Sequence, residues 1–459
     1  MFPARRHFTT VVVLLVLACG DGALDSAISS PDFRRAGDVS TELPSNVVYL
    51  TTNDPTLGQN AVLAFRRDVS CSLTLLGRFS MGGTGVGNPN FRLGTLESDQ
   101  SLIVSPDGRF LFAVNAGSNT VAAFSILADG TLVPVEGSPV RSHGRQPAGL
   151  AFQDKFLYVT HKNEVPGEDP ADFPRPNYTT FRVNPHGKLH AIPDFTIKVP
   201  RGSSPTQVLI SNDGKFAFST ELLVDFPLDF FPTDGFPAAP GAGGGNTLRS
   251  FAIGPHGRLN PIPAIRIPGP DQNFPDPLGL LSGSAHISGT TNGAFALQDH
   301  PVEPILYVAF PFRFQVGVYT WNRGTGRLTF GTVVGGSGQM PMWLQVSPDG
   351  RFLYVVNRLD STISVYDLSD PLNPVEIIFR DLRLAPGATS GGLAGQQSLT
   401  PDGQCLYVIE QRITDADSEG SANALHALTG IGVTEPFAPI NLGAFGVPRT
   451  ARPQGIAAF

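Results

Sequence analysis

The sequence predicts an all-β protein, a seven-bladed β-propeller with four-stranded antiparallel blades. Two observations lead to this prediction. A short hairpin pattern, clear in SPDGRFLFAVN at residues 105–115, recurs along the 459-residue chain. The composition, with 51 Gly, 41 Pro and only 15% charged residues, is typical of many short strands joined by tight turns rather than of long helices.

Seven copies of the pattern align on one aromatic residue in the second strand of each unit: Tyr49, Phe112, Tyr158, Phe218, Tyr307, Tyr354 and Tyr407. In most units an apolar strand and a turn such as Pro-Asp-Gly, which tight hairpins favour, come before this residue. A third strand follows, such as NTVAAFSI at 119–126, and several units add a Gly turn and a short fourth strand, such as TGRLTFG at 325–331. Repeated four-stranded units indicate a propeller, because stacking around an axis covers faces that a single small sheet would expose.

The two ends of the propeller sequence are expected to share one blade. The first unit begins at Asn46 and lacks both an inner strand and the Pro-Asp-Gly turn. The chain ends with RPQGIAAF at 452–459, which is similar to RQPAGLAF at 145–152, the inner strand of the third unit. We therefore expect the C-terminal strand to join the N-terminal blade and close the ring, so that residues 46–459 form one propeller.

The N-terminus has the features of a bacterial export signal. Arg5 and Arg6 precede an apolar run at 11–17, which is too short to span a bilayer, and a lipobox-like Val-Leu-Ala-Cys ending at Cys19 follows. We predict a signal peptide at 1–19, a lipid anchor on Cys19 and a flexible tether at 20–45. The mature protein would then be a periplasmic or outer-surface lipoprotein that touches the membrane only through this anchor. The alternative is an ordinary signal peptide in which Cys19 is incidental.

Charge and motifs argue against several classes of function. The formal net charge is −7 and no basic stripe is present, so nucleic acid is not an expected partner. The nine His are scattered and no His-Glu-x-x-His, Cys-x-x-Cys or EF-hand pattern occurs, so we predict no metal and no cofactor. Export would permit a disulfide between Cys71 and Cys405, which only the geometry of the fold can decide.

Candidate functional residues lie where the second strands end. On this rim of the predicted propeller the connecting loops carry long insertions, and variable loops on a rigid scaffold usually carry function. The third residue after each aromatic anchor ends its strand: Thr52, Asn115, His161, Glu221, Phe310, Asn357 and Glu410. Thr206, Gln207, Gln396 and Gln454 stand at the starts of inner strands on the same rim.

Roles can be assigned to these residues by their chemistry. Glu221, His161 and Glu410 are the predicted catalytic acids or bases. The predicted substrate-binding residues are Asn115, Gln207, Asn357, Arg358 and Arg412, of which the two arginines could hold an anion. The alternative is that these polar side chains cap backbone groups and hydrogen-bond to neighbouring loops.

The repeated units resemble the lactonase family of seven-bladed propellers, which includes 6-phosphogluconolactonase-like proteins and carboxymuconate-lactonising enzymes. The clearest units are SPDGRFLFAVNAGSNTVAAFSI at 105–126 and SPDGRFLYVVNRLDSTISVYDL at 347–368, and the resemblance covers residues 46–459. Within SPTQVLISNDGKFAFSTELL at 204–223, Pro205 and Leu222 match the family and Glu221 falls on its Glu. Thr206 and Gln207 stand where the family has Arg and His, and QPAG at 146–149 replaces an expected His-x-His.

Two hypotheses for function follow. The first is an exported lactonase-like enzyme that hydrolyses or forms a small cyclic ester of a carboxylate or sugar acid. The second is a non-catalytic propeller that binds a small molecule or an envelope protein through its loop-rich face. Under either hypothesis we expect a monomer. Convergence of Glu221, His161 and an Arg would favour the enzyme, whereas a wide apolar rim formed by VDFPLDFFPTDGFP at 224–237 would favour the binder.

Overall fold

The computed structural model describes residues 46–86, 98–162, 175–200, 204–222, 247–266, 294–384, 392–412, 423–430, 433–434 and 438–459. All of these belong to one compact unit, Thr41–Phe459. The predicted export signal and tether, and the Phe/Pro-rich stretch at 224–237, lie outside the described residues. Within the described residues no helix is long and apolar enough to cross a membrane.

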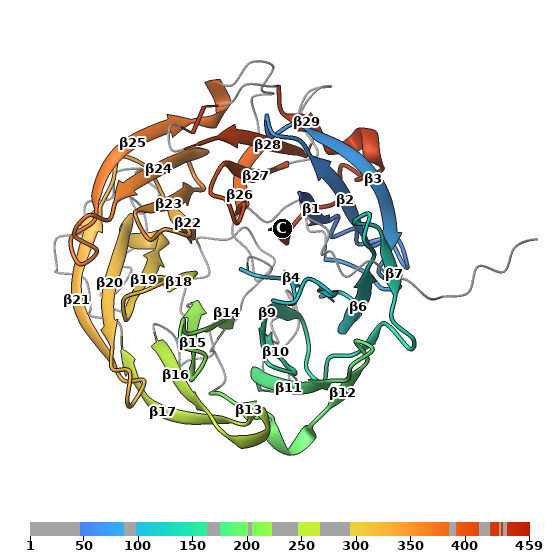
Figure 1. Cartoon of the computed structure of the whole chain (residues 1–459), viewed down its shortest axis with the longest axis horizontal. Coiled ribbons are helices and arrows are strands. Elements are labelled where there is room, and N and C mark those ends of the chain that lie inside the picture. The colour runs from blue at the N-terminus through green and yellow to red at the C-terminus, as the bar shows by residue number, and fades with distance from the viewer. Residues whose placement is uncertain are drawn as a thin grey trace, which may run out of the picture. The chain divides into compact units, whose positions relative to one another are not determined.

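The described strands form seven antiparallel sheets set as blades around an axis, which confirms the predicted fold (Figure 1). Blade 1 contains β1 (Val47–Thr51), β2 (Ala61–Arg67), β3 (Leu73–Ser80) and β30 (Ile456–Ala458). Blade 2 contains β4 (Leu102–Val104), β5 (Phe110–Asn115), β6 (Thr120–Ile126), β7 (Leu132–Pro134) and β8 (Val140–Arg141). Blade 3 contains β9 (Pro147–Gln153), β10 (Phe156–His161), β11 (Asn177–Val183), β12 (Leu189–Ala191) and β13 (Ile197–Lys198).

The remaining four blades each have four strands. Blade 4 contains β14 (Ser204–Ile210), β15 (Phe216–Leu222), β16 (Thr247–Ile253) and β17 (Leu259–Arg266). Blade 5 contains β18 (Leu297–Asp299), β19 (Ile305–Phe310), β20 (Gln315–Trp321) and β21 (Leu328–Gly335), and blade 6 contains β22 (Pro341–Val346), β23 (Phe352–Asn357), β24 (Thr362–Asp367) and β25 (Val375–Asp381). Blade 7 contains β26 (Gly392–Leu399), β27 (Cys405–Arg412), β28 (Ala424–Thr429) and β29 (Ile440–Asn441). Short 3-10 turns are η2 (Pro193–Phe195), η4 (Pro255–Gly257), η5 (Pro311–Arg313), η6 (Leu382–Leu384) and η7 (Leu442–Phe445).

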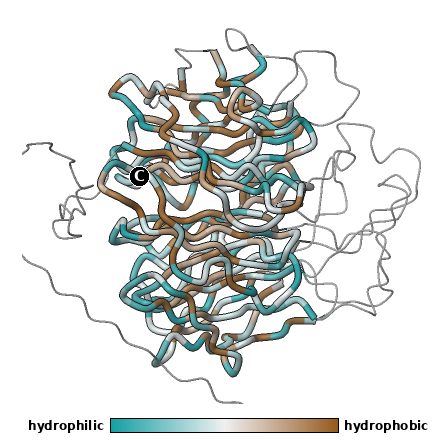
Figure 2. Tube along the Cα trace, turned by 90° about the vertical axis from the view of Figure 1, so that its right-hand side faces the viewer, coloured by the Kyte–Doolittle hydropathy of each residue, from teal (hydrophilic) through white to brown (hydrophobic). Residues whose placement is uncertain are grey.

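The second strand of each blade is apolar because both of its faces are covered. All six residues of β10 are buried. Leu157 and Val159 pack into a core cluster shared with blade 2, whereas Tyr158 packs into one shared with blade 4. Figure 2 shows the same arrangement as hydrophobic segments that run through the interior, with hydrophilic segments at many turns. Stacked blades therefore bury both faces of each sheet, and the core is distributed between blades.

The recurrent Ser-Pro-Asp-Gly turn is held by its own side chains. In blade 2, Ser105 Oγ donates to Asp107 Oδ1 over 2.6 Å and accepts from the Phe110 N–H over 3.0 Å. Gly108 has a φ of +64°, a conformation that glycine adopts without steric cost. Ser347 and Asp349 repeat the bond between the two side chains in blade 6. The motif recurs because most blades need a tight turn between their first two strands, whereas blade 1 takes these two strands from opposite ends of the described chain.

The C-terminal strand closes the ring, as predicted. β30 pairs antiparallel with β1, with Tyr49 opposite Ala457. The Val47 N–H donates to the Phe459 carbonyl over 2.9 Å, and the Phe459 N–H donates to the Val47 carbonyl over 2.8 Å. Ile456 is 5% exposed and belongs to the core cluster between blades 1 and 7. One blade is therefore assembled from both ends of the described chain.

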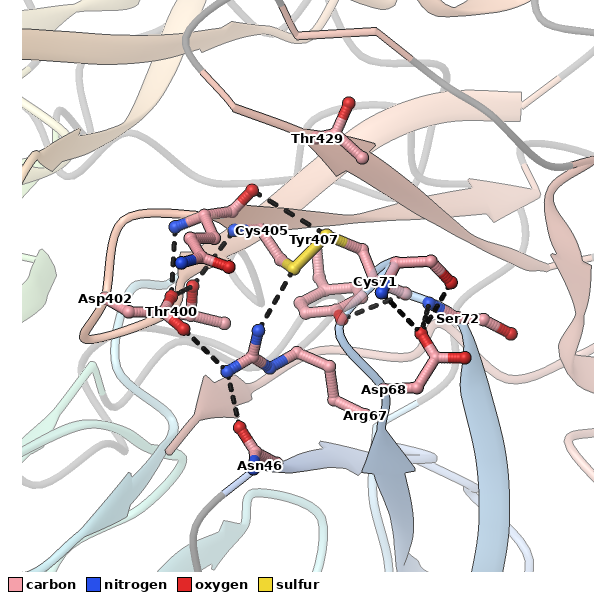
Figure 3. Close-up of a disulfide and its surroundings, with 12 residues drawn as sticks. Asn46, Arg67, Asp68, Cys71, Ser72, Thr400, Asp402, Cys405, Tyr407 and Thr429 are labelled. Atoms are coloured by element: carbon pink, nitrogen blue, oxygen red, sulfur yellow. Dashed lines mark hydrogen bonds and ion pairs between the residues drawn. A yellow bond between two sulfur atoms is a disulfide. The ribbon is translucent and has the colours of Figure 1, made fainter.

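A disulfide joins the same two blades. Cys71, in the turn between β2 and β3 of blade 1, is bonded to Cys405 at the start of β27 in blade 7, with their Cα atoms 5.6 Å apart (Figure 3). Around it, Arg67 forms a 2.8 Å ion pair with Asp402, and the Tyr407 hydroxyl donates to the Cys71 carbonyl over 3.0 Å. The junction where the ring closes is thus held by a strand, a covalent bond and a buried arginine.

Candidate functional site

All seven strand-end residues lie where they were predicted, at or next to the ends of second strands, and all are buried. Their exposed fractions are at most 6%. Glycines just before an inner strand or at its first residue lie against several of these side chains. A Cβ atom at Gly144 would collide with the ring of His161, one at Gly338 with Asn357, and one at Gly392 with Glu410. Only glycine permits so close a backbone approach, so these side chains are enclosed by the rim.

Glu221 forms an ion pair with Arg249, a residue that was not predicted from the sequence. Glu221 is on β15 and Arg249 on the adjacent strand β16. Arg249 Nε donates to Glu221 Oε1, and Arg249 Nη2 donates to Glu221 Oε2 over 3.1 Å, which makes the pair bidentate. The Glu221 side chain is 0% exposed and that of Arg249 is 20% exposed. Although burial opposes its charge, the bonded Glu221 carboxylate raises the pKa of Arg249.

Glu410 is also paired with a side chain of the next strand, here through a single nitrogen atom. His426 Nε2 lies 2.8 Å from Glu410 Oε2, and both side chains are buried. In the strand registers, Arg249 and His426 occupy equivalent positions, two residues beyond the partner of the strand-end carboxylate. Blade 6 uses these positions for a neutral pair, in which Asn357 Nδ2 donates to Ser364 Oγ over 2.9 Å.

This equivalence is the sequence signal that could have revealed Arg249 and His426. In NTVAAFSI of blade 2 and NYTTFRV of blade 3, the equivalent third-strand residues are Ala122 and Thr179. This third-strand position carries small side chains in blades 2 and 3. A charged or titratable residue there, in a blade whose second strand ends in a carboxylate, therefore indicates that the two side chains are paired.

His161 is placed differently from the two carboxylates. Neither of its ring nitrogens makes a hydrogen bond with a described residue. Burial is the main cause that lowers the pKa of His161 to about 3. The imidazole is therefore neutral at physiological pH and would be a weak base.

The predicted substrate-binding residues connect neighbouring strands and blades. Asn115 Nδ2 donates to the Met81 carbonyl over 3.1 Å, and Gln207 Oε1 accepts from the Leu297 N–H over 2.6 Å. Arg358 lies over the Trp343 ring, donating to the Ala394 carbonyl and to Gln411 Oε1, and the Arg412 N–H donates to Asn423 Oδ1. These contacts fit the structural alternative, and their role in binding substrate stays a prediction. Cys19 lies outside the described residues.

A small cavity of about 20 Å³, little more than the space for one water molecule, lies at the loop-rich rim between blades 1, 2 and 3. Its lining includes Asn53, Ser98, Gln146, Lys162 and Gln454. Lys162 follows His161 directly and is 1% exposed. It was not predicted from the sequence, although a lysine immediately after a buried strand end is an unusual choice. Within the described residues no group of three or more His, Cys, Asp or Glu could hold a metal ion.

The segment that leads into blade 2 connects the inner strands across the axis. β4 lies near the centre of the ring in Figure 1. Residues 98–100 make hydrogen bonds to five other blades, through Gln454, Leu150, Thr206, Trp343 and Gln396. The shortest is a 2.6 Å bond from Gln396 Nε2 to Asp99 Oδ1. Residues 98–100 thus connect the inner strands of these blades, and the buried Asp99 carboxyl group accepts the bond from blade 7.

Asp99 is expected to make stability depend on pH. Burial raises its pKa from 3.8 to about 6, so the folded state retains a proton that the unfolded chain releases at lower pH. Stability should therefore fall as the pH rises from about 4 to about 6, by up to about 3 kcal/mol from this group. Urea unfolding of wild type and Asp99→Asn across this range would show the effect. Equal slopes for the two proteins would contradict it.

Comparison with known proteins shows a family match and several solved structures with a similar fold. A family model described as "Lactonase, 7-bladed beta-propeller" matches residues 59–168. Among solved structures, a "putative 6-phosphogluconolactonase" from Bacteroides fragilis is 16% identical with a TM-score of 0.55, covering 86% of this chain and 95% of that one. One from Bacteroides uniformis is 17% identical with a TM-score of 0.53, covering 74% and 85%. A "hypothetical selenium-binding protein" from Sulfolobus tokodaii is 10% identical with a TM-score of 0.59, covering 90% and 94%.

No curated protein matches the sequence. At these sequence identities the solved structures show the fold alone. The family match covers residues 59–168, whose described strands belong to blades 1, 2 and 3. The family match supports the resemblance to the lactonase family of seven-bladed β-propellers over residues 59–168, and the two "putative" 6-phosphogluconolactonase structures share the fold. The predicted family resemblance is thereby confirmed.

Proposed function

We propose that the chain is a lactonase-type hydrolase of a small lactone, with its site on the loop-rich rim at the Glu221–Arg249 pair. The observation that carries the proposal is that Glu221, at the position of the family's Glu, is paired bidentately with a partly exposed arginine. Thr206 and Gln207 occupy the positions where the family has Arg and His. Arg249 supplies a cation from the neighbouring strand instead.

The chemistry required is addition of water to the ring carbonyl. The carbonyl oxygen gains negative charge, the ring C–O bond then breaks, and the released alkoxide takes up a proton to give the hydroxy acid. Arg249 uses Nε and Nη2 on Glu221, and Nη1 makes no hydrogen bond with a described residue, so it can donate to the developing oxyanion. Glu221 holds the guanidinium in place and acts as the base that accepts a proton from the attacking water.

Turnover of lactones tests this proposal. Purified chain should hydrolyse at least one member of a panel of sugar lactones and muconolactone-type substrates, assayed with and without divalent metal. Glu221→Gln should lower kcat/KM about 10²-fold, because the arginine loses its anionic partner. Arg383→Gln is the matched control, since Arg383 makes a bidentate pair with Asp381 on the surface.

A non-catalytic propeller that binds a ligand or an envelope protein through the same face is the second candidate. It is favoured by the burial of Glu221, His161 and Glu410, each at most 6% exposed. If folded protein turns over no lactone in the panel, this candidate replaces the first. The next step would then be the capture of ligands or envelope proteins with the immobilised chain.

Export to the cell envelope, with a lipid on Cys19, is part of the proposal. It is supported by the Cys71–Cys405 disulfide, because structural disulfides persist in oxidising compartments such as the periplasm. Mass spectrometry of the mature protein isolated from membranes, with Cys19→Ser as the control, tests the anchor. An N-terminus without lipid would contradict it.

A further inference from the structure

The outer strand of blade 6 carries an apolar stripe that faces solvent. Val375, Ile377 and Phe379 alternate along β25 and are 62%, 48% and 46% exposed. Leu372, in the turn before the strand, is 44% exposed. Alternate residues of a strand lie on one face, so these side chains form a continuous surface. Exposed apolar patches of this kind usually mark sites of interaction.

β25 is also an edge strand. It is the last strand in the order β22-β23-β24-β25, and it lies on the outer circumference of the ring in Figure 1. An unpaired edge offers backbone N–H and C=O groups to another strand. In the described structure Arg380 Nε is buried and makes no hydrogen bond. The strand therefore combines an open edge, an apolar face and an arginine whose Nε makes no hydrogen bond with a described residue.

The central part of β25, EIIFR at 376–380, is self-complementary when read antiparallel about Ile378. In this register Glu376 of one copy lies opposite Arg380 of the other, and the reverse pair forms by symmetry. Ile377 lies opposite Phe379 on the other face, again twice. Opposite charges and apolar–aromatic residues in directly opposed positions stabilise antiparallel strand pairs.

The existing bonds of Glu376 leave room for such a partner. Its Oε2 accepts from the Ser337 N–H over 2.9 Å and from Ser337 Oγ over 2.7 Å. Both donors are neutral, and a carboxylate has about four acceptor positions. An arginine of a second copy can therefore add to these bonds without breaking them.

We propose that the chain forms a two-fold symmetric homodimer by antiparallel pairing of β25 with β25 of a second copy, in the register centred on Ile378. A second copy fits best because charge and apolar positions complement themselves in one register, which a strand of unrelated sequence would do only by chance. A symmetric strand pair is an isologous contact, so assembly stops at the dimer. The proposal replaces the expectation of a monomer and is independent of catalysis.

A charge swap tests the register. Sedimentation velocity across a micromolar concentration range should show a reversible dimer for the wild-type chain. Arg380→Glu places like charges opposite each other at both symmetry-related pairs and should weaken the dimer about tenfold or more. The double variant Glu376→Arg/Arg380→Glu restores opposite charges and should recover much of the affinity. Lys198→Glu, on an exposed outer strand of blade 3, is the matched control and should have no effect.

The outcomes distinguish the β25 register from any different contact between two copies. Near-UV circular dichroism of each variant establishes that it is folded. A wild-type chain that stays monomeric, or a dimer that Arg380→Glu leaves intact, overturns the proposal. A dimer that Arg380→Glu disrupts and the double variant fails to restore also overturns it, because another contact would then be responsible. Disruption followed by recovery supports it.

Discussion

Removal of residues 453–459 is expected to prevent the chain from forming a stable propeller. The deletion removes β30, so β1 loses its inner partner and the ring is open at blade 1. It also removes Ile456 from the core, which alone should cost about 2–5 kcal/mol. Gln454, which donates to Ser98 at the axis over 2.8 Å, is lost as well. Natural domains are stable by only about 5–15 kcal/mol, so these losses together should abolish cooperative folding.

Thermal and urea unfolding of the truncated chain measures this effect. We expect either no soluble protein or a broad transition at a much lower midpoint. Val69→Ser is a suitable control, because Val69 belongs to the same blade and is 94% exposed. A truncated chain that unfolds cooperatively at the wild-type midpoint would show that β30 does not close the ring.

Loss of the disulfide should have the second-largest effect on stability. Cys71 and Cys405 are 334 residues apart in the sequence, so the bond restricts nearly the whole unfolded propeller. Native disulfides of this kind contribute about 2–5 kcal/mol. The folded structure should survive, because β30, the Arg67–Asp402 ion pair and the Tyr407 hydrogen bond also hold blade 1 to blade 7.

Urea unfolding with and without a reductant separates the stability that comes from the disulfide bond from the stability that comes from the surrounding contacts. Reductant should lower the midpoint of the wild-type chain and leave that of Cys71→Ser/Cys405→Ser unchanged. A wild-type midpoint that does not respond to reductant, under conditions where free thiols are detected, would contradict the prediction.

The fold could be predicted from the sequence because its signals are local and repeated. The Ser-Pro-Asp-Gly turn and the apolar second strand are each specified within about ten residues, as in blades 2 and 6. The closure by residues 456–458 was predictable because those residues repeat an inner-strand pattern. The disulfide could not be predicted, since it depends on how closely blade 7 approaches blade 1 after the ring has closed.

The candidate site was only partly predictable. Strand-end residues such as Glu221 and Glu410 were located by their position in the repeat. Their partners Arg249 and His426 were missed because the register of the third strand determines which residues meet. The hydrogen bonds of Asp99 were even harder to predict from the sequence, because its partner Gln396 is 297 positions away and lies across the axis.

Glu221 and Arg249 are proposed to act as one unit in lactone hydrolysis, and a double-mutant cycle on kcat/KM tests whether they do. Glu221→Gln and Arg249→Gln should each lower kcat/KM about 10²-fold, and the double variant should be no more impaired than either one. Losses that multiply to about 10⁴-fold would show that the two residues act independently. Single variants that retain wild-type turnover would place the reaction elsewhere.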